Sequence, residues 1–323
     1  MTNLNTPELI PLEPATQAFI DALSAKQSPP IYTLSPEEAR KVLEDAQASP
    51  ASLSDASIEE VRVPDGVKVT IVRPRNVDAI TLPGVVYMHG GGWILGSFKT
   101  HERLVRALAV GTGAAILFVN YTPSPEARFP VALDEAYSAF RYFAHSGARH
   151  SIDGERLALA GDSVGGNMAT VVAIMSNTEH GPIPRAQLMF YPVTSGVMNT
   201  ASYEEFSGGP WLTRKAMEWF WDAYIPDQAV RDAIVASPLL AEKDTLAGLP
   251  ESMVITAESD VLRDEGEQYA QRLAAAGVKT TAIRYIGTVH DFVMLNALAN
   301  TPAALHATQT ACQFLRARLA LKR

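Results

Sequence analysis

The chain has 323 residues, with 27 lysines and arginines against 35 aspartates and glutamates, so its formal net charge is −8. This acidic balance argues against a nucleic-acid-binding protein, because phosphate recognition requires a basic face. Hydrophobic residues make up 47% and charged residues 19% of the chain, which is typical of a globular protein with a sizeable core.

The N-terminal segment differs from the rest of the chain. It has no basic region followed by an apolar stretch, and no part of the chain reaches the ~18 consecutive apolar residues of a membrane span, so we expect a cytoplasmic protein without membrane contact. Residues 1–57 contain two short amphipathic helical patterns separated by a break at 28–30. The second pattern has Ser35 as N-cap, Pro36 in the first turn and Glu38 at the capping-box position. The segment is therefore predicted to be a helical attachment.

From residue 67 the sequence pattern becomes that of a sheet. Val67, Val69 and Ile71 alternate with polar residues, as in a strand with one exposed face. Later apolar runs lack this alternation, as strands of a buried parallel sheet do; they lie at 85–88, 115–119, 157–160, 186–191, 253–257 and 281–286. Helical patterns alternate with them, at 101–112, 130–146, 165–177, 263–276 and from 302 to the end. This order predicts one doubly wound α/β domain over residues 58–323.

The alternation is interrupted at 197–226, which contains an aromatic-rich helical pattern and no strand. An insertion after a strand overhangs the carboxyl ends of the sheet, where sites of this fold class lie. Several aromatic residues either line an apolar pocket there or only pack the inserted helix on the sheet: Trp93, Phe98, Trp211, Trp219, Phe220 and Trp221.

The most informative motif is the pentapeptide GDSVG at 161–165, between an apolar run and a helical pattern. It matches the nucleophile elbow, a tight strand-to-helix turn that lifts a serine hydroxyl, here that of Ser163, clear of the sheet. The following helix N-terminus presents unpaired amides to a developing negative charge. The alternative interpretation is an ordinary glycine-rich turn that binds phosphate.

A second motif, HGGGW at 89–93, follows the apolar run at 85–88. Three consecutive glycines leave backbone amides free to point at a small anion, as an oxyanion hole requires. A dinucleotide site needs G-x-G-x-x-G spacing and a P-loop needs a following lysine, and neither pattern is present. The motif therefore favours an oxyanion loop over a nucleotide site.

A serine nucleophile requires a histidine base and an acid that orients it, in the chain order serine, acid, histidine for this fold. Asp260 follows the strand pattern at 253–257, and His290 follows the last strand pattern. Both residues are therefore expected on the same rim of the sheet as Ser163.

Other acids and histidines fit these roles less well. Glu258 lies within the strand pattern, Asp264 lies in the next helix, and the side chain of Asp291 is expected to point away from its neighbour His290. His89 is interpreted as a donor that fixes the glycine loop. The remaining histidines are expected on the solvated surface: His101, His145, His150, His180 and His306.

These motifs resemble the hormone-sensitive-lipase-like branch of the α/β-hydrolase superfamily, the microbial esterases with an HGGG loop and a GDSAG-type elbow. Other matching segments are NYTPSPEARFPVALDEAY, SPLLA, ESDVLRDEGEQYAQRLAAAG and VHDF, and the resemblance covers about residues 60–320. It implies a triad and an oxyanion hole, with Ser163, Asp260 and His290 in the first and the amides of Gly91, Gly92 and Val164 in the second. It also implies that residues 1–57 and 197–226 form a cap over acyl and alcohol pockets.

Three positions depart from the family pattern. Val164 replaces the usual alanine and adds bulk beside the nucleophile. Thr122 stands where an arginine normally braces the core. Asp291 replaces a glycine that often follows the histidine, and its charge is expected to raise the pKa of that histidine.

The expected reaction is hydrolysis of a small-molecule carboxylic ester through an acyl-enzyme, with no cofactor and no metal. The resemblance implies short to medium acyl chains and suggests a homodimer. An amidase or deacetylase with the same triad is the alternative, followed by a non-catalytic ligand-binding relative, against which the presence of His290 argues. Cys312 is the only cysteine, so an intrachain disulfide is excluded and we expect a reduced packing residue in the last helix.

Overall fold

A single sheet of eight strands forms the centre of the computed structural model, which describes residues 11–75 and 81–319. The strands are β1 (Ala56–Arg62), β2 (Lys68–Pro74), β3 (Leu82–Met88), β4 (Ala115–Asn120), β5 (Ile152–Asp162), β6 (Ala186–Phe190), β7 (Glu251–Ser259) and β8 (Thr280–Val289). Their order across the sheet is β1-β2-β4-β3-β5-β6-β7-β8. Strand β2 runs antiparallel to both of its neighbours, and all the other pairs are parallel.

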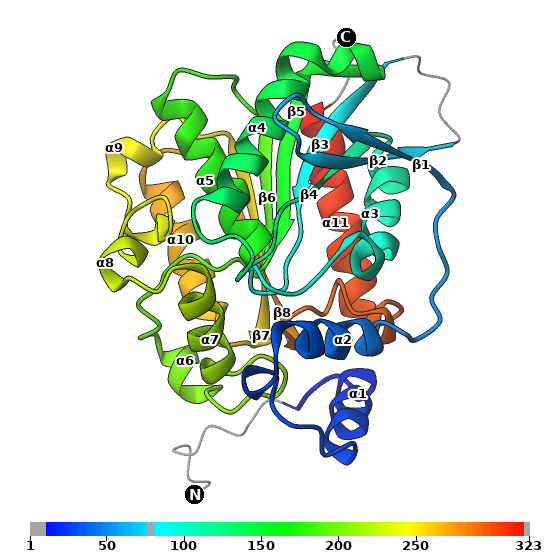
Figure 1. Ribbon diagram of the computed structural model, residues 1–323, viewed down its shortest axis with the longest axis vertical. Helices are drawn as coiled ribbons and strands as arrows, with labels where there is room; N and C mark the ends of the chain where they lie inside the picture. Colours follow the sequence, from blue (N-terminus) through cyan, green and yellow to red (C-terminus); the bar gives the residue numbers. More distant parts are fainter. Residues whose placement is uncertain (1–10, 76–80, 320–323) are drawn as a thin grey trace, which may run out of the picture.

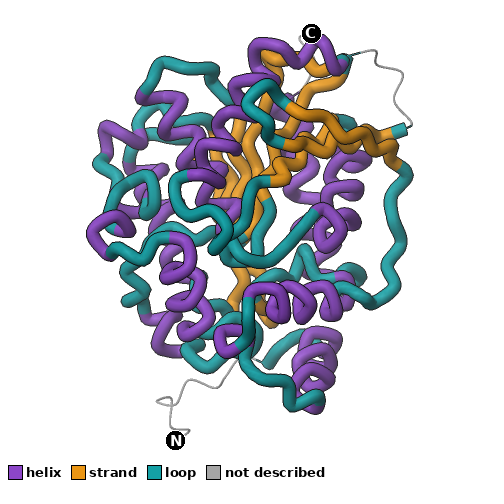
Figure 2. The backbone as a smooth tube through the Cα atoms, viewed as in Figure 1, coloured by secondary structure: helices purple, strands orange, loops and turns teal. Residues whose placement is uncertain are grey.

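Helices cover both faces of this sheet (Figures 1 and 2). One face is covered by α3 (Phe98–Thr112) and α11 (Pro302–Leu319), and the other by α4 (Val131–Ser146), α5 (Val164–Thr178) and α10 (Arg263–Ala275). The short helices α8 (Gln228–Arg231) and α9 (Lys243–Leu246) lie outside that second layer. The alternating patterns predicted such a sheet with helices on both faces, and the family resemblance implied its α/β-hydrolase arrangement.

Four helices gather at the end of the sheet where β7 and β8 finish (Figure 1). They are α1 (Pro14–Ala25), α2 (Pro36–Ala46), α6 (Ala201–Glu205) and α7 (Arg214–Tyr224), with the 3-10 turn η1 (Ile31–Thr33) between the first two. The predicted capping box is present at the start of α2, because the Ser35 hydroxyl accepts from the Glu38 amide and Glu38 accepts from the Ser35 amide. Residues 1–10 of the predicted N-terminal attachment and 320–323 of the predicted last helix lie outside the described residues.

The first strand was not expected. The sheet was predicted to begin at residue 67, but β1 precedes that point and pairs along its whole length with β2. Most of its residues are exposed or half-buried, as the edge position of the strand requires. Its sequence, ASIEEVR, therefore lacks the apolar run by which the inner strands are recognised.

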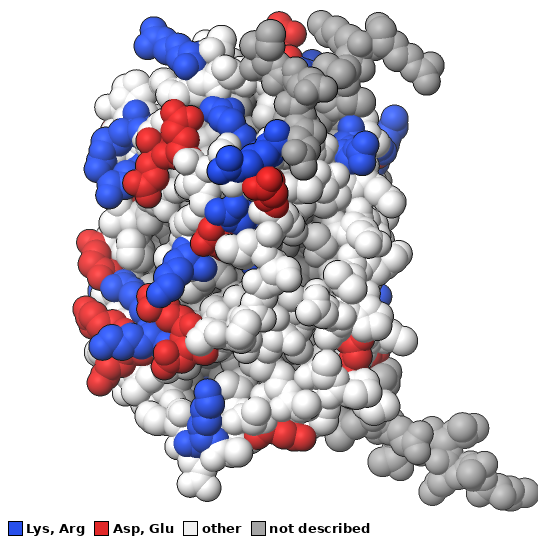
Figure 3. Space-filling model, turned by 90° about the vertical axis from the view of Figure 1, so that its right-hand side faces the viewer, with Lys and Arg blue, Asp and Glu red and all other residues white. Residues whose placement is uncertain are grey.

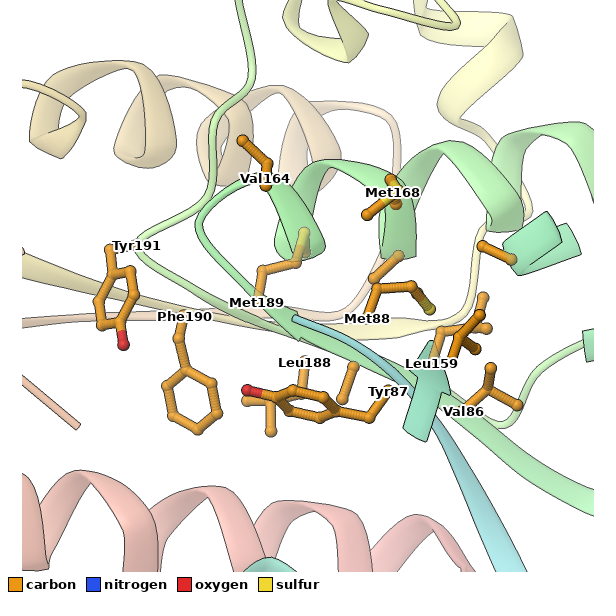
Figure 4. Packing of buried hydrophobic residues seen from close by; sticks show 14 of the residues in the cluster. Val86, Tyr87, Met88, Leu159, Val164, Met168, Leu188, Met189, Phe190 and Tyr191 are labelled. Atoms are coloured by element: carbon orange, nitrogen blue, oxygen red, sulfur yellow. The ribbon is translucent and has the colours of Figure 1, made fainter. Parts of the chain in front are cut away.

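The inner strands are buried on both faces, as their continuous apolar sequences predicted. In β6, Met189 points toward α5, while Leu188 and Phe190 point to the opposite face, toward α11 (Figure 4). All three are fully buried. Burial of one such side chain contributes about 2 kcal/mol, so the two helix layers are held to the sheet mainly by these alternating contacts.

Positive and negative side chains are interspersed on the face shown in Figure 3, and uncharged residues cover a broad area of it. This face therefore offers no continuous basic surface of the kind that a phosphate backbone needs. None of the helices in the described part of the chain is both long and apolar enough to cross a membrane.

The turn between β5 and α5 positions the centre of the candidate site. Ser163 is the single residue between β5 and α5. Its backbone has φ 55° and ψ −121°, a conformation that residues other than glycine rarely adopt. The turn is possible because its neighbours are glycines: a Cβ on Gly165 would lie 2.0 Å from the carbonyl oxygen of Met88, and one on Gly161 would lie 2.2 Å from that of Gly165. Strand, turn and helix are thus in backbone contact.

The variant Gly165→Ala is expected to be destabilised by about 3 kcal/mol or more, because the added methyl group meets backbone that cannot move alone. Urea unfolding measures the loss. The control Gly208→Ala adds a methyl group where no atom lies within 4 Å, and its stability should change by no more than about 0.5 kcal/mol. Equal stability of the two variants would contradict this packing argument.

Candidate active site

Three side chains from separate strand ends form one hydrogen-bonded row. Ser163 follows β5, Asp260 follows β7 and His290 follows β8. The His290 Nε2 atom lies 3.0 Å from Ser163 Oγ, and its Nδ1 atom lies 2.7 Å from Asp260 Oδ2. The other oxygen of Asp260 accepts from the amide of Leu262, which fixes the carboxylate. All three polar side chains are at most 4% exposed, so water competes weakly for these bonds.

Asp291 lies on the Nε2 side of the imidazole, opposite Asp260. Its Oδ2 atom accepts a 2.9 Å hydrogen bond from Trp211 Nε1, whereas its buried Oδ1 atom has no hydrogen-bond partner and lies 3.4 Å from His290 Nε2. The prediction that its side chain points away from His290 is therefore wrong. The backbone of Asp291 has φ 66°, and the simple alternation of side chains along an extended segment does not apply there.

These two carboxylates control the protonation of the histidine. Burial lowers the pKa of His290, but the charges of Asp260 and Asp291 outweigh it and raise the pKa to about 9. The direction agrees with the effect expected from the sequence for Asp291. Burial also raises the pKa of Asp291 itself.

The competing acids have other partners. Glu258 accepts from the amide of Gly287 at 2.7 Å, and Asp264 accepts from the amide of Ser202 at 2.8 Å and pairs with Arg263. Neither is bonded to the imidazole of His290. Of the acids considered from the sequence, Asp260 is the one that contacts Nδ1.

The glycine loop borders the same cavity as the serine. Gly91 and Gly92 line this cavity together with Ser163 and His290, and both glycines have positive φ. Val164 is the first residue of α5, so its amide is one of the unpaired donors at the helix N-terminus. A Cβ on Gly92 would lie 2.1 Å from the Phe220 ring, which shows how closely α7 packs on the loop.

The histidine that begins the loop has a local role in the structure. His89 Nδ1 lies 2.7 Å from the carbonyl oxygen of Gly90, and Tyr121 donates from its hydroxyl to the carbonyl of His89. Burial lowers the pKa of His89 to about 3, so it is a neutral donor to the loop, as interpreted from the sequence.

His101 was expected on the surface, and that prediction is wrong. It is fully buried on the inner face of α3, and its Nε2 atom lies 3.2 Å from Asp162 Oδ2. Burial alone would raise the pKa of Asp162, but His101 and the Tyr87 hydroxyl lower it below its usual value. A Cβ on Gly90 would lie 2.3 Å from the same carboxylate. The pair therefore lies directly beneath both the elbow and the glycine loop.

The cavity above the serine has a volume of about 390 Å³. Its walls come from α1, α2 and α7 and the segments beside them, as well as from the two motifs. Apolar wall residues from α1, η1, α2 and the segment around α7 are Leu23, Ile31, Leu43, Trp211, Leu212 and Phe220. The family resemblance implied that the N-terminal segment covers the pocket, but no pattern in its sequence identified the individual wall residues, because their partners lie far away along the chain.

The aromatic residues divide between the two interpretations left open by the sequence. Trp211 and Phe220 line the cavity. Trp93 and Trp221 instead pack on each other, with ring centroids 4.8 Å apart. The other two are also packing residues: Phe98 stands edge-on to Phe118, and Trp219 is tilted against Phe220.

Arg40 on α2 was not recognised from the sequence. Its guanidinium donates to the carbonyl of Ile94, just after the glycine loop, and forms two hydrogen bonds with Glu126. Thr122, which replaces the expected arginine, donates from its amide and hydroxyl to Glu135. The region near Glu126 is thus braced by an arginine from a distant helix.

Across residues 11–75 and 81–319, no group of three or more His, Cys, Asp or Glu side chains is arranged to hold a metal ion. Cys312 is a free, buried residue of α11.

Comparison with known proteins extends the family resemblance. The sequence pattern of the alpha/beta hydrolase fold family matches residues 85–294. The crystal structure of a thermostable esterase from Pseudomonas putida superposes with a TM-score of 0.95 at 46% identity, covering 98% of this chain and 100% of that one. The carboxylesterase NlhH of Mycobacterium tuberculosis is 37% identical over 84% of this chain and 86% of its own length.

A further relative, an ethyl acetate hydrolase from Pseudomonas putida, is 32% identical over 89% of this chain and 93% of its own length. These similarities extend over nearly the whole chain, and all three of these proteins are named for ester hydrolysis. The chain therefore belongs to the hormone-sensitive-lipase-like branch of the α/β-hydrolase superfamily and is a carboxylic ester hydrolase.

Proposed function

We propose that this enzyme is a serine carboxylesterase in which Ser163, His290 and Asp260 form the catalytic triad. The observation that carries the proposal is the row of hydrogen bonds from Ser163 Oγ through the imidazole to Asp260, at the base of a cavity. His290 takes the serine proton as the hydroxyl attacks the ester carbonyl, and Asp260 holds the imidazole tautomer. The protonated histidine then gives its proton to the leaving alcohol.

Water then attacks the acyl-serine by the same route and releases the acid. During both steps negative charge develops on the former carbonyl oxygen. We assign its stabilisation to the amides of Gly91, Gly92 and Val164, which lie on the two loops that border the serine. Each such donor accounts for a factor of about 10² to 10³ in rate in enzymes of this type.

Residues 1–57 and 197–226 would act as a cap on the catalytic domain, residues 58–323. Their described parts supply most of the apolar cavity walls, and α7 contacts η1, so the two segments meet beside the cavity. The cavity is at the small end of the ligand-site range of about 300 to 1,000 Å³. A small apolar cavity enclosed by helices favours short to medium acyl chains over long ones.

Replacement of the proposed nucleophile tests the mechanism directly. Ser163→Ala should lower kcat for a p-nitrophenyl acyl ester by a factor on the order of 10⁴ to 10⁶, because no acyl-enzyme forms. The control Ser52→Ala changes an exposed serine between α2 and β1 and should keep full activity. Wild-type turnover by purified Ser163→Ala would refute the proposed triad.

The rate should depend on pH through His290, which must be neutral to accept the serine proton. Because its pKa is raised to about 9, kcat/KM should increase with pH up to about that value. Asp291→Asn removes one of the charges that raise this pKa but keeps an acceptor for Trp211. The rise in kcat/KM should therefore shift to lower pH, and activity at pH 7 relative to that at pH 9 should increase.

The exposed Asp232→Asn is the charge control for this measurement and should leave the pH profile unchanged. An identical profile for Asp291→Asn and the wild type would show that Asp291 does not influence the base.

The acyl preference is tested with p-nitrophenyl esters from acetyl to palmitoyl. We expect the largest kcat/KM between acetyl and octanoyl and a steep fall beyond, because a longer chain exceeds the cavity. A maximum at myristoyl or longer would contradict the proposed chain length but would not contradict the proposed triad.

A further inference from the structure

The chain that follows His290 is bonded to the end of the second N-terminal helix. Gln47, the C-cap residue of α2, is 8% exposed and donates from Nε2 to the carbonyl oxygens of Thr100 and Met294. Its Oε1 atom accepts from the amide of Asn296 at 2.8 Å, and its own carbonyl accepts from Asn296 Nδ2 at 2.9 Å. One glutamine therefore satisfies backbone groups on both α3 and the His290 loop.

Arg103 holds the same loop from the other side. Its guanidinium donates to Asn296 Oδ1 at 3.0 Å and to the carbonyl oxygens of Val293 and Met294. Because Arg103 and Gln47 share Met294 and Asn296 as partners, the loop after His290 is fixed between α2 and α3. Such a network is worth more than its separate bonds, since each broken bond would leave a buried polar group without a partner.

The chain before His290 is also bonded to the N-terminal segment. The amide of Glu13, at the start of α1, donates to the carbonyl of Gly287 at 2.8 Å, and the Gly287 amide donates to Glu258. Helix α1 contacts β8, near whose end this bond forms. The beginning and the end of the described N-terminal helices thus hold the two flanks of His290.

We propose that Gln47 is a positioning residue for His290, and that it makes catalysis depend on the docking of α2. The inference rests on the proposed role of His290 as the base. A displacement of about 1 Å in a catalytic group can lower the rate about 10²-fold. The buried hydrogen bonds that hold the loop after His290 should therefore affect the rate directly. Gln47 itself does not line the cavity, and its effect reaches the substrate only through the loop.

The test is the variant Gln47→Met, which keeps a side chain of similar length and removes its hydrogen bonds. We expect kcat to fall about 10- to 100-fold for short and medium esters alike, with KM changed less than twofold. The rate of Ser163 labelling by a fluorophosphonate probe should fall in parallel, because that reaction also needs the base. A residue that only shapes the pocket would instead change KM, by an amount that depends on the acyl chain.

Asn296→Ala releases the same loop by removing its other bonds, those of Asn296 Nδ2 to the Gln47 carbonyl and of Asn296 Oδ1 to Arg103, and it decides the question if Gln47→Met does not fold. In the double variant the loss in kcat should be smaller than the product of the two single losses, since both changes release the same loop after His290. The control is Glu44→Ala, an exposed change on α2 that should leave kcat and KM unaltered.

Unchanged kcat and labelling rates in Gln47→Met and Asn296→Ala would overturn the inference, as would a loss of thermal stability without a loss of kcat. Failure of the underlying mechanism is distinguishable, because it would appear as activity retained by His290→Ala. If His290→Ala is inactive while Gln47→Met has wild-type kcat, the triad stands and the positioning role is rejected.

Discussion

The backbone contact between β3, the elbow and α5 is the constraint on which the site depends. Gly165 lies so close to the carbonyl of Met88 that no side chain fits between them. This contact holds Ser163 in its strained conformation and, because the glycine loop starts directly after Met88, it also fixes the distance between Ser163 and the loop. Strain of this kind persists only where the surroundings over-determine it, and here two glycines and two buried strands do so.

Two titratable side chains, Asp162 and His101, lie fully buried beneath that contact, where ionisable groups are normally excluded. Asp162 is fully buried, yet His101 and the hydrogen bond from the Tyr87 hydroxyl hold its pKa below the usual value. Above it, His290 is buried beside carboxylates that raise its pKa. The two layers are linked, since Gly90 packs on the Asp162 carboxylate and the following glycines border the serine. The buried Asp162–His101 pair thus supports the loop, and the charge of Asp162 also contributes to the raised pKa of His290.

The sequence predicted those features whose signals are local. The buried strands, the elbow and the capping box of Ser35 were recognisable because each depends on residues close together in the chain. Strand β1 was missed because an edge strand needs no apolar run, and the burial of His101 was missed because its partner Asp162 is distant in sequence. The same limit applies to Arg40, since a charged residue on an amphipathic helix shows no sign of its partners on other elements.

The long-range bonds also explain why the N-terminal helices belong to the active site rather than to its surroundings. They contribute cavity walls, and they are bonded to Gly287 and Asn296 on either side of His290. Local opening of these helices would therefore uncover the cavity and release both flanks of His290 in one event. If these helices act as the proposed cap, the enclosure of the cavity and the alignment of the imidazole are two results of the same set of contacts.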